Sequence, residues 1–249
     1  MLFPDGLINH AAFILFTGIA VYAQNLTGFA LALVLLGLVG FTGIVPLEDA
    51  INAVSIIAVV NAALFLYRRR PFRLEPAFRP AIGGSLVGYF VGMGLLGILS
   101  SHSYELLKLL LGLSIIACAL LLWRTAKPSA LPYSAGRFGF VGWLSGILGG
   151  MFSTPGPPLV YAVYRQPWSL RTMQESLVFC FGIGAALRLV VMSVSGQVSA
   201  QAVLLGVESL PIVLAITALA ANRKPPFSRK ALQHMVCILL ICAGAGMLF

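Results

Sequence analysis

The stretch Gly149 to Pro158, with the sequence GGMFSTPGPP, constrains more than any other how this chain can fold. It lies in the middle of an apolar segment of membrane-spanning length, from Phe138 to Tyr164. Its three prolines remove three amide donors and prevent a continuous helix, so the segment must break there. Inside a bilayer, broken backbone is tolerated only where it is buried in protein or lines a wet cavity, because lipid supplies no hydrogen-bond partner. The break therefore predicts a functional site.

The composition places this segment in a membrane. Of the 249 residues, 59% are hydrophobic and only 9% are charged, whereas a soluble domain carries about 25% charged residues. The long apolar runs lack the alternation of barrel strands, so the spans are expected to be helices. No basic region followed by a cleavage site opens the sequence, and we expect no removable signal peptide. The sequence predicts an all-α integral membrane protein.

Six other apolar runs are long enough to cross a bilayer. They span residues 51–67, 80–99, 104–123, 172–194, 200–221 and 231–249. A second broken segment, residues 8–38, is notched at Gln24 to Gly28. Gly84, Gly88 and Gly92 recur every four residues along one span, which predicts a flat strip against which a neighbouring backbone packs closely. A glycine-lined path for substrate is the alternative interpretation.

The two halves of the chain resemble each other. Asn61 to Leu66 corresponds to Gly184 to Leu189, and the same shift carries Gly83 onto Gly206. We predict a first transmembrane repeat at residues 1–124, a basic cytoplasmic linker at 125–137 and a second transmembrane repeat at 138–249. Each repeat consists of one broken segment and three transmembrane helices.

The charge distribution predicts how the repeats are oriented. The net charge is +9, but the basic residues sit mostly in short loops, as the positive-inside rule requires, so a nucleic-acid partner is excluded. If both broken segments are re-entrant hairpins, the basic clusters at 68–79, 124–137, 165–171 and 223–230 all face the cytoplasm. The repeats then have inverted topology, with six crossings and both chain ends outside.

The lengths of the hairpin arms fit this topology unequally. Gly139 to Gly149 and Pro157 to Tyr164 are each about ten residues, or roughly 15 Å, too short to cross a hydrocarbon core of about 30 Å. The arms of the first broken segment are each about fifteen residues. They predict either deep re-entrant arms or one long kinked helix.

A half-helix begins at each predicted break. Pro157 and Pro158 suit a first helical turn, and Ser153, Thr154 and Gly156 are candidate caps. In the first segment, Thr27 or Asn25 would cap the arm that begins at Gly28. Free amides and the positive dipole end of such helices attract an anion. The alternative is that both breaks are structural kinks whose hydroxyls satisfy freed carbonyl groups.

Two ionisable residues lie deep within the second-half spans. Arg188 and Glu208 are each ten residues from Val198 at the turn, so an antiparallel pair of helices places them at the same depth. We predict an ion pair between them. It serves either to lock two helices, or to transport an anion near Arg188 while Glu208 takes up a proton.

One motif resembles a known family. Gly146 to Phe152, leading through Pro155 to Leu159 into a helix, and more weakly Gln24 to Phe29, are similar to the TauE/SafE family of sulfite and organosulfonate exporters. The resemblance in organisation covers nearly the whole chain. It implies export of a small sulfur-containing or carboxylate anion across a bacterial inner membrane.

The predicted function is a secondary transporter that exports a small anion bound near the midplane, between the two broken-helix tips. Alternatives are an intramembrane enzyme and a non-transporting membrane subunit. No cofactor or metal is expected, the partners are the substrate and the lipid bilayer, and a homo-oligomer is compatible with the sequence. The predicted substrate-binding residues are Gln24, Asn25, Thr27, Gly28, Ser153, Thr154, Gly156 and Arg188, and Glu208 is the predicted proton-coupling or ion-pair residue.

Overall fold

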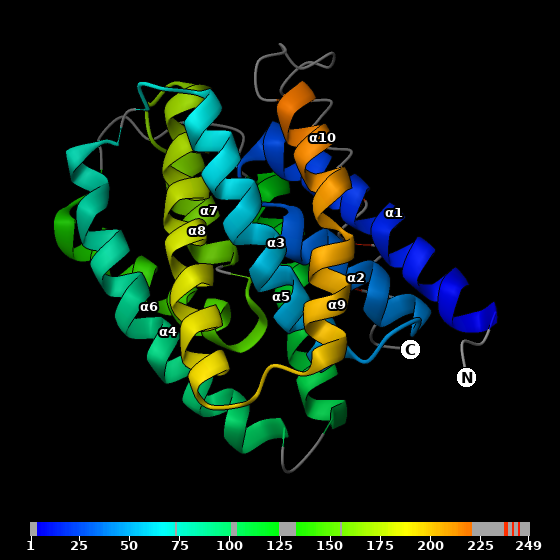
Figure 1. The fold of residues 1–249 in the computed structure, drawn as a ribbon. Helices are drawn as coiled ribbons and strands as arrows, with labels where there is room; N and C mark the ends of the chain where they lie inside the picture. Colours follow the sequence, from blue (N-terminus) through cyan, green and yellow to red (C-terminus); the bar gives the residue numbers. More distant parts are fainter. Residues whose placement is uncertain are drawn as a thin grey trace.

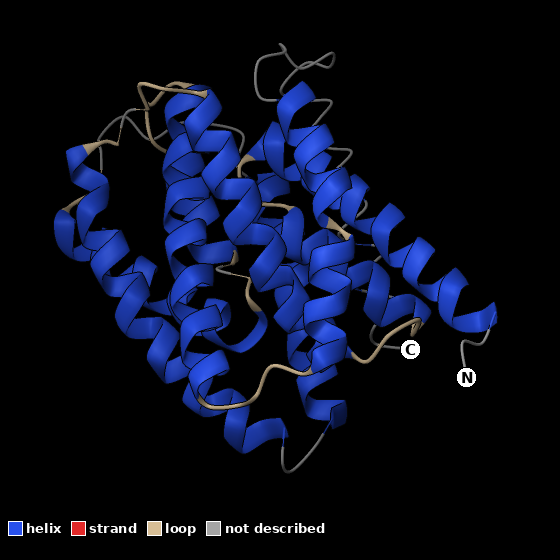
Figure 2. Cartoon of the chain, in the orientation of Figure 1, coloured by secondary structure: helices blue, strands red, loops and turns tan. Residues whose placement is uncertain are grey.

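The computed structural model describes residues 4–72, 74–100, 104–124, 133–154 and 156–220, together with positions 237, 238, 241 and 244. All regular secondary structure in these ranges is helical (Figure 2). In chain order the elements are α1 (Pro4–Thr27), α2 (Leu31–Thr42), α3 (Leu47–Arg68), the short 3-10 helix η1 (Pro76–Phe78), α4 (Arg79–Ser100), α5 (Tyr104–Arg124), α6 (Ala135–Phe152), α7 (Pro157–Tyr164), α8 (Leu170–Val194), α9 (Ala200–Glu208) and α10 (Leu210–Ala220).

Five helical stretches in the described residues are long and apolar enough to cross a membrane. They are Gly6–Thr27, Leu47–Arg68, Pro76–Leu99, Leu170–Val194 and Ala200–Ala220. Four of them confirm predicted spans, and the fifth is the first arm of the first broken segment. The predicted span at 104–123 is helical as α5, whereas the predicted span at 231–249 lies almost wholly outside the described residues.

Both predicted breaks are confirmed as helix interruptions. The first separates α1 from α2 and the second separates α6 from α7. Figure 1 shows that the chain enters and leaves each pair at the same end of the bundle, and that the two pairs use opposite ends. Each broken segment is therefore a helical hairpin whose tip lies inside the protein.

The hairpin arms differ in length from the sequence prediction. Helix α1 has 24 residues and α6 has 18, where about fifteen and about ten were expected. The longer α1 reaches past mid-height, since Gly28 at its tip contacts Gln174 near the start of α8, at the basic end of the bundle. Helix α6 is long because its glycines, which are poor helix formers in isolation, gain packing against α4.

The predicted span 200–221 is interrupted once. Helix α9 ends at Glu208 and α10 begins at Leu210, with Ser209 between them. Pro211 has no amide hydrogen to donate to the preceding turn, which explains the interruption. The Ser209 hydroxyl donates to the Leu205 carbonyl oxygen at 2.8 Å and so satisfies an acceptor at this point.

The predicted glycine strip on α4 is confirmed as a packing surface. A Cβ atom on Gly88 would lie 2.9 Å from the Cα of Gly146 and closer still to the carbonyl oxygen of Trp143. Gly84 and Gly92 face the α6 backbone in the same way, one turn to either side. The backbones of α4 and α6 therefore touch along their length, and the strip is filled by α6.

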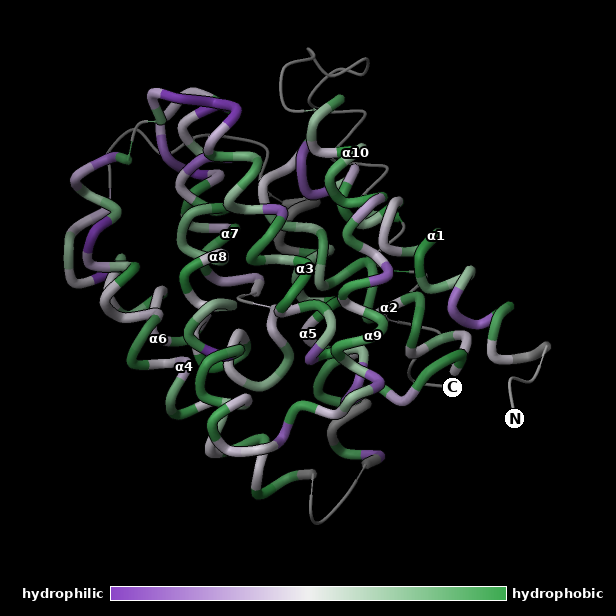
Figure 3. The backbone as a smooth tube through the Cα atoms, viewed as in Figure 1, coloured by the Kyte–Doolittle hydropathy of each residue, from purple (hydrophilic) through white to green (hydrophobic). Residues whose placement is uncertain are grey.

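Charge separates the two ends of the bundle. Figure 3 shows hydrophilic positions gathered where α3 ends and α8 begins, the end that also holds the basic stretch after Arg68 and the Arg165 to Arg171 stretch. The basic linker at 125–132 and the basic loop at 223–230 lie outside the described residues. Cys118, Cys180 and Cys237 are buried free thiols, and Cys242 lies outside the described residues.

The α4–α6 contact predicts a position-specific cost of added volume. Gly88→Ala should destabilise the protein by about 1–3 kcal/mol, because the new methyl group meets backbone atoms that have no rotamer by which to move. Gly94→Ala is the matched control on the same helix, since nothing lies within 4 Å of a Cβ there. Thermal unfolding of both purified variants checks this, and equal melting temperatures would contradict the packing described.

Candidate functional site

The tip of the second hairpin combines a strained residue with a proline-led helix start. Helix α6 ends at Phe152 and is followed by Ser153, whose φ of 55° lies in the left-handed region that residues with side chains rarely adopt. Gly156 then precedes α7, with Pro157 in the first turn as predicted. Ser153 and Thr154 are both buried, but neither caps α7 with its side chain, so their predicted capping role is wrong.

The tip of the first hairpin is capped by a residue other than the predicted ones. Gln24 accepts a hydrogen bond through its Oε1 atom from the Leu31 amide at 3.2 Å, where α2 begins. The Thr27 hydroxyl donates to the Ala23 carbonyl oxygen at 2.7 Å and accepts from the Phe29 amide at 3.4 Å, so it bonds the turn before α2, whereas the predicted Asn25 cap is wrong. Gly28 has a φ of 89°, and a Cβ there would lie 2.8 Å from the Cα of Gln174.

Asn25 belongs to a buried polar group that joins three helices. Its Nδ2 atom donates to the Thr217 hydroxyl at 3.2 Å, and that hydroxyl donates to Asn61 Oδ1 at 2.6 Å. These residues come from α1, α10 and α3, so the group fixes the first hairpin against the bundle.

The two hairpins face each other across a small pocket inside the bundle. A pocket of about 10 Å³ lies between them and is lined by Gln24 from one tip and by Ser153 and Thr154 from the other. Ala58 and Phe181, near the middles of α3 and α8, also line it. In this conformation the pocket has room for one water-sized occupant.

Arg188 is the largest fully buried side chain among the described residues, and it is held by neutral groups. Its Nη1 atom donates to Asn52 Oδ1 at 2.9 Å and to the Ser55 hydroxyl at 3.0 Å. Its Nε atom donates to the Gly150 carbonyl oxygen at 3.1 Å. In the part of the chain that the structure describes, no carboxylate lies within ion-pair distance of this guanidinium.

Glu208 has a different partner from the predicted one. Its Oε2 atom lies 2.6 Å from Nδ1 of His10, whose Nε2 lies 3.0 Å from Nε2 of Gln201. The predicted ion pair between Arg188 and Glu208 is therefore wrong. Helix α9 packs against α3 and α1, so Glu208 faces α1 rather than α8. Equal depth along two helices does not fix the direction in which each side chain points.

Arg188 forms the inner wall of a second and larger cavity. This cavity has a volume of about 310 Å³ and is lined by Glu48, Asn52, Gln197 and Met192 as well as Arg188. It lies at the end of the bundle opposite the basic residues, where α3 begins and α8 ends (Figure 1). A cavity of this size at a buried cation can hold a small organic anion.

A chain of hydroxyl groups connects the cavity with the pocket between the tips. Ser55 accepts from Arg188 and lies 3.0 Å, oxygen to oxygen, from Ser153. Arg188 lines the large cavity and Ser153 lines the small pocket, so this contact between α3 and the second tip connects residues that line the two spaces.

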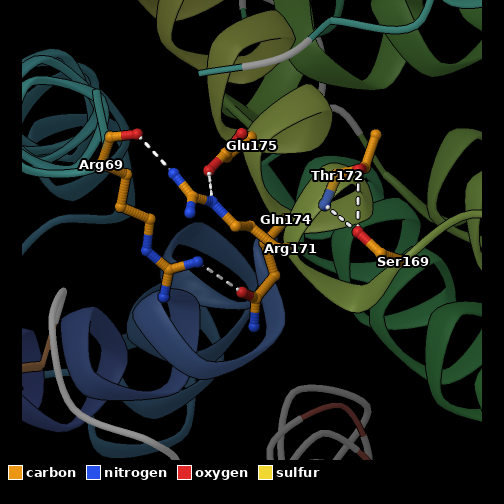
Figure 4. Close-up of polar contacts among 6 residues, drawn as sticks. All are labelled: Arg69, Ser169, Arg171, Thr172, Gln174 and Glu175. Atoms are coloured by element: carbon orange, nitrogen blue, oxygen red, sulfur yellow. Dashed lines mark hydrogen bonds and ion pairs between the residues drawn. The ribbon is translucent and has the colours of Figure 1, made fainter. Parts of the chain in front are cut away.

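A polar cluster closes the opposite, basic end of the bundle (Figure 4). Arg69 donates to Gln174 Oε1 at 2.8 Å, and Gln174 donates through Nε2 to the Leu26 carbonyl oxygen at the first tip. Arg171 donates to the Arg69 carbonyl oxygen at 2.7 Å and to Glu175 at 2.6 Å. We call these four side chains the inner latch, because they join the end of α3 to the start of α8 and to the first tip.

The inner latch is partly shielded from water. Burial lowers the pKa of the Arg69 guanidinium, and the nearby Glu175 carboxylate opposes this shift. The first tip is held a second time by the Tyr164 hydroxyl, which donates to the Thr27 carbonyl oxygen at 2.7 Å. The first tip is therefore held at the basic end of the bundle, while the large cavity lies at the other end.

Sequence reasoning missed several of these residues. Asn52, Ser55 and Gln174 are not among the predicted site residues. The signal available for α3 was spacing, since Glu48, Asn52 and Ser55 fall on one helical face. No comparable pattern marks Gln174, whose partners lie 105 and 148 residues away in the chain.

Comparison with known proteins decides the family. The profile of the family described as "Sulfite exporter TauE/SafE" matches residues 12–247. The chain belongs to this family. A TauE/SafE relative from Cupriavidus necator, described as "Probable sulfite/organosulfonate exporter TauE", is 29% identical over 235 residues, covering 93% of this chain and 90% of the relative. No solved structure matches the chain significantly.

This membership confirms the resemblance seen in the sequence. TauE/SafE proteins are a transporter family, and together with the apolar helices this makes the chain a multi-pass bacterial membrane protein. The described residues contain no group of three His, Cys, Asp or Glu side chains that could hold a metal ion.

The inner latch predicts a stability effect at Gln174. Gln174→Leu should lower the free energy of unfolding by about 1–3 kcal/mol, because the buried Leu26 carbonyl oxygen loses its donor. Thr172→Val is the control two residues away, where the hydroxyl bonds only the exposed Ser169 side chain among the described residues. Thermal unfolding in detergent measures both, and a Gln174 variant as stable as the control would contradict the latch.

Proposed function

We propose that the protein is a secondary transporter that exports a small anion, such as sulfite, an organosulfonate or a related carboxylate, across the bacterial inner membrane. The observation that carries this proposal is Arg188, a fully buried cation with no carboxylate partner among the described residues. A buried charge is costly unless it is paired, so the site favours an anion that enters and leaves. The name of the Cupriavidus necator relative supports the same substrate class.

The anion is proposed to bind at the inner wall of the 310 Å³ cavity. There, Nη2 of Arg188 makes no hydrogen bond with a described residue, and Asn52 lines the same wall. Asn52 and Ser55 hold the guanidinium from α3, so they position the charge. From this wall, the Ser55 to Ser153 contact leads to the small pocket between the tips, through which the anion would pass when the inner latch opens.

Two inverted-topology repeats are proposed to underlie this transport cycle. Asn61 and Gly184 are 184 − 61, or 123, residues apart. The same offset places residues 47–68 of α3 at 170–191, which lie within α8 (Leu170–Val194), so the two helices correspond. The packing has the same correspondence, because α4 lies against α6 and α10 lies against α1. Opening one end while closing the other would then move the α4–α6 pair, which takes one helix from each repeat, relative to the α1–α10 pair.

The driving force is proposed to be the membrane potential or a proton gradient. The potential alone drives an anion outward by about 2.3 kcal/mol per charge per 100 mV. The His10–Glu208 pair is the candidate for proton coupling, because it joins α1, which carries the first tip, to α9 through two protonatable groups.

Removing the charge at Arg188 tests the transport site. Arg188→Gln should reduce anion flux into proteoliposomes about tenfold or more, since one charge-assisted interaction with the anion is lost. Arg188→Lys keeps the charge without the planar fork and should retain intermediate flux. Sulfite, a C2 organosulfonate and a short carboxylate serve as substrates, each without nucleotide.

The control for this experiment is Arg137→Gln, the same change at an exposed position of α6. It should transport as the unmodified protein does. Size-exclusion profiles show whether each variant is folded. Substrate turnover without flux would favour an intramembrane enzyme, and neither flux nor turnover in the unmodified protein would favour a non-transporting subunit.

The inverted-repeat topology has a separate test. With six crossings and two hairpins, both chain ends lie outside the cytoplasm. A reporter active only in the periplasm, fused after Phe249, should be active, and one inserted after Arg70 should be silent. A cytoplasmic signal from the fusion after Phe249 would contradict the proposed topology.

A further inference from the structure

The pocket between the two tips differs from the Arg188 cavity in both size and chemistry. Its volume is about 10 Å³ against about 310 Å³. Such a space accepts one particle of about the size of water and excludes a sulfonate in this conformation. No Lys, Arg, Asp or Glu is among its lining residues. Its occupant must therefore be judged from the neutral groups that surround it.

Those groups are mainly hydrogen-bond donors. Ala32 and Leu33 line the pocket in the first turn of the twelve-residue helix α2, and their amides have no hydrogen bond with a described residue. The Leu31 amide already donates to Gln24 Oε1. The Nε2 group of the same side chain has no hydrogen-bond partner among the described residues. The positive end of the α2 dipole lies at the same place.

An independent observation at the other tip also indicates a missing ligand. Thr154 is only 2% exposed, it lines the pocket, and its hydroxyl oxygen has no hydrogen-bond partner among the described residues. Buried hydroxyl groups nearly always have a partner. Phe29 and Phe181 complete the wall, and aromatic ring edges carry partial positive charge.

We propose that this pocket binds a single dehydrated halide-sized anion, for which chloride is the natural probe. An anion accepts hydrogen bonds from the α2 amides and from Thr154 at once. A cation would face the positive helix end, and the one side-chain amide oxygen lining the pocket, Gln24 Oε1, is already engaged. The site is distinct from the Arg188 cavity, and its occupancy does not rest on the proposed transport function.

If the transport proposal also holds, the two sites influence each other. The Ser153 and Ser55 hydroxyls, 3.0 Å apart, connect the pocket to Arg188. Two anions at the ends of this short chain repel each other, so chloride in the pocket should weaken substrate binding at Arg188, and the reverse must hold equally.

The test is chloride binding by the purified full-length protein without substrate. In gluconate buffer of constant ionic strength, chloride and bromide should raise the melting temperature saturably, and sulfate should not. Thr154→Val should weaken the chloride affinity about tenfold or more, as expected for one hydrogen bond to a charged ligand. Thr17→Val is the matched control, because its hydroxyl is equally buried and unpartnered in the described chain but lines neither space.

Two further measurements keep the proposal falsifiable. Anomalous diffraction from bromide-soaked crystals of the unmodified protein should place a peak between Leu33 and Thr154, whether or not the Thr154 variant folds. Arg188→Gln should retain a saturable halide effect with lower affinity, because a nearby positive charge is lost while the pocket itself is unchanged. The proposal is overturned if only water occupies the pocket, or if Thr17→Val loses as much chloride affinity as Thr154→Val. It is also overturned if the halide effect disappears in Arg188→Gln and persists in Thr154→Val. Absence of anion flux alone would contradict the proposed transport function but not the proposed halide site.

Discussion

A lipid bilayer cannot hydrogen-bond a peptide group, and the rest of this structure depends on how the chain meets that constraint. Breaking two helices inside the protein releases carbonyl and amide groups that need partners. At the first tip, Gln24, Gln174 and Tyr164 supply them, and the last two belong to the other half of the chain. The requirement that creates the tips therefore also ties the halves together at the place where an anion would pass.

The features that could be predicted from sequence are those that follow from local chemistry. Prolines 155, 157 and 158 force a break wherever they occur, and glycines four residues apart on α4 form one face whatever the neighbouring helix is. The family resemblance rested on the same stretch. None of these inferences required knowledge of how the helices are rotated about their axes.

The inferences that failed needed that rotation. Arg188 and Glu208 lie at matching depths, yet Glu208 faces His10 on α1, and α9 packs on α3 rather than on α8. Gln24 caps α2 across seven residues through a tight turn whose geometry depends on the φ of 89° at Gly28. The partners of Arg188 on α3 are neutral, so charge matching could not have found Asn52 and Ser55.

The contact between α4 and α6 has a mechanical consequence. Two backbones that touch without intervening side chains cannot slide past each other, since each displacement along the axis would drive a carbonyl group into a neighbouring main chain. In the proposed transport cycle, these helices would move together as one rigid body and carry the second tip with them. The contacts of α3 are of a different kind. Arg69, Asn52 and Ser55 contact their partners through side chains, which can rotate and exchange one hydrogen-bond partner for another. Glycine is usually associated with flexibility, but here the glycines of α4 make the α4–α6 pair rigid.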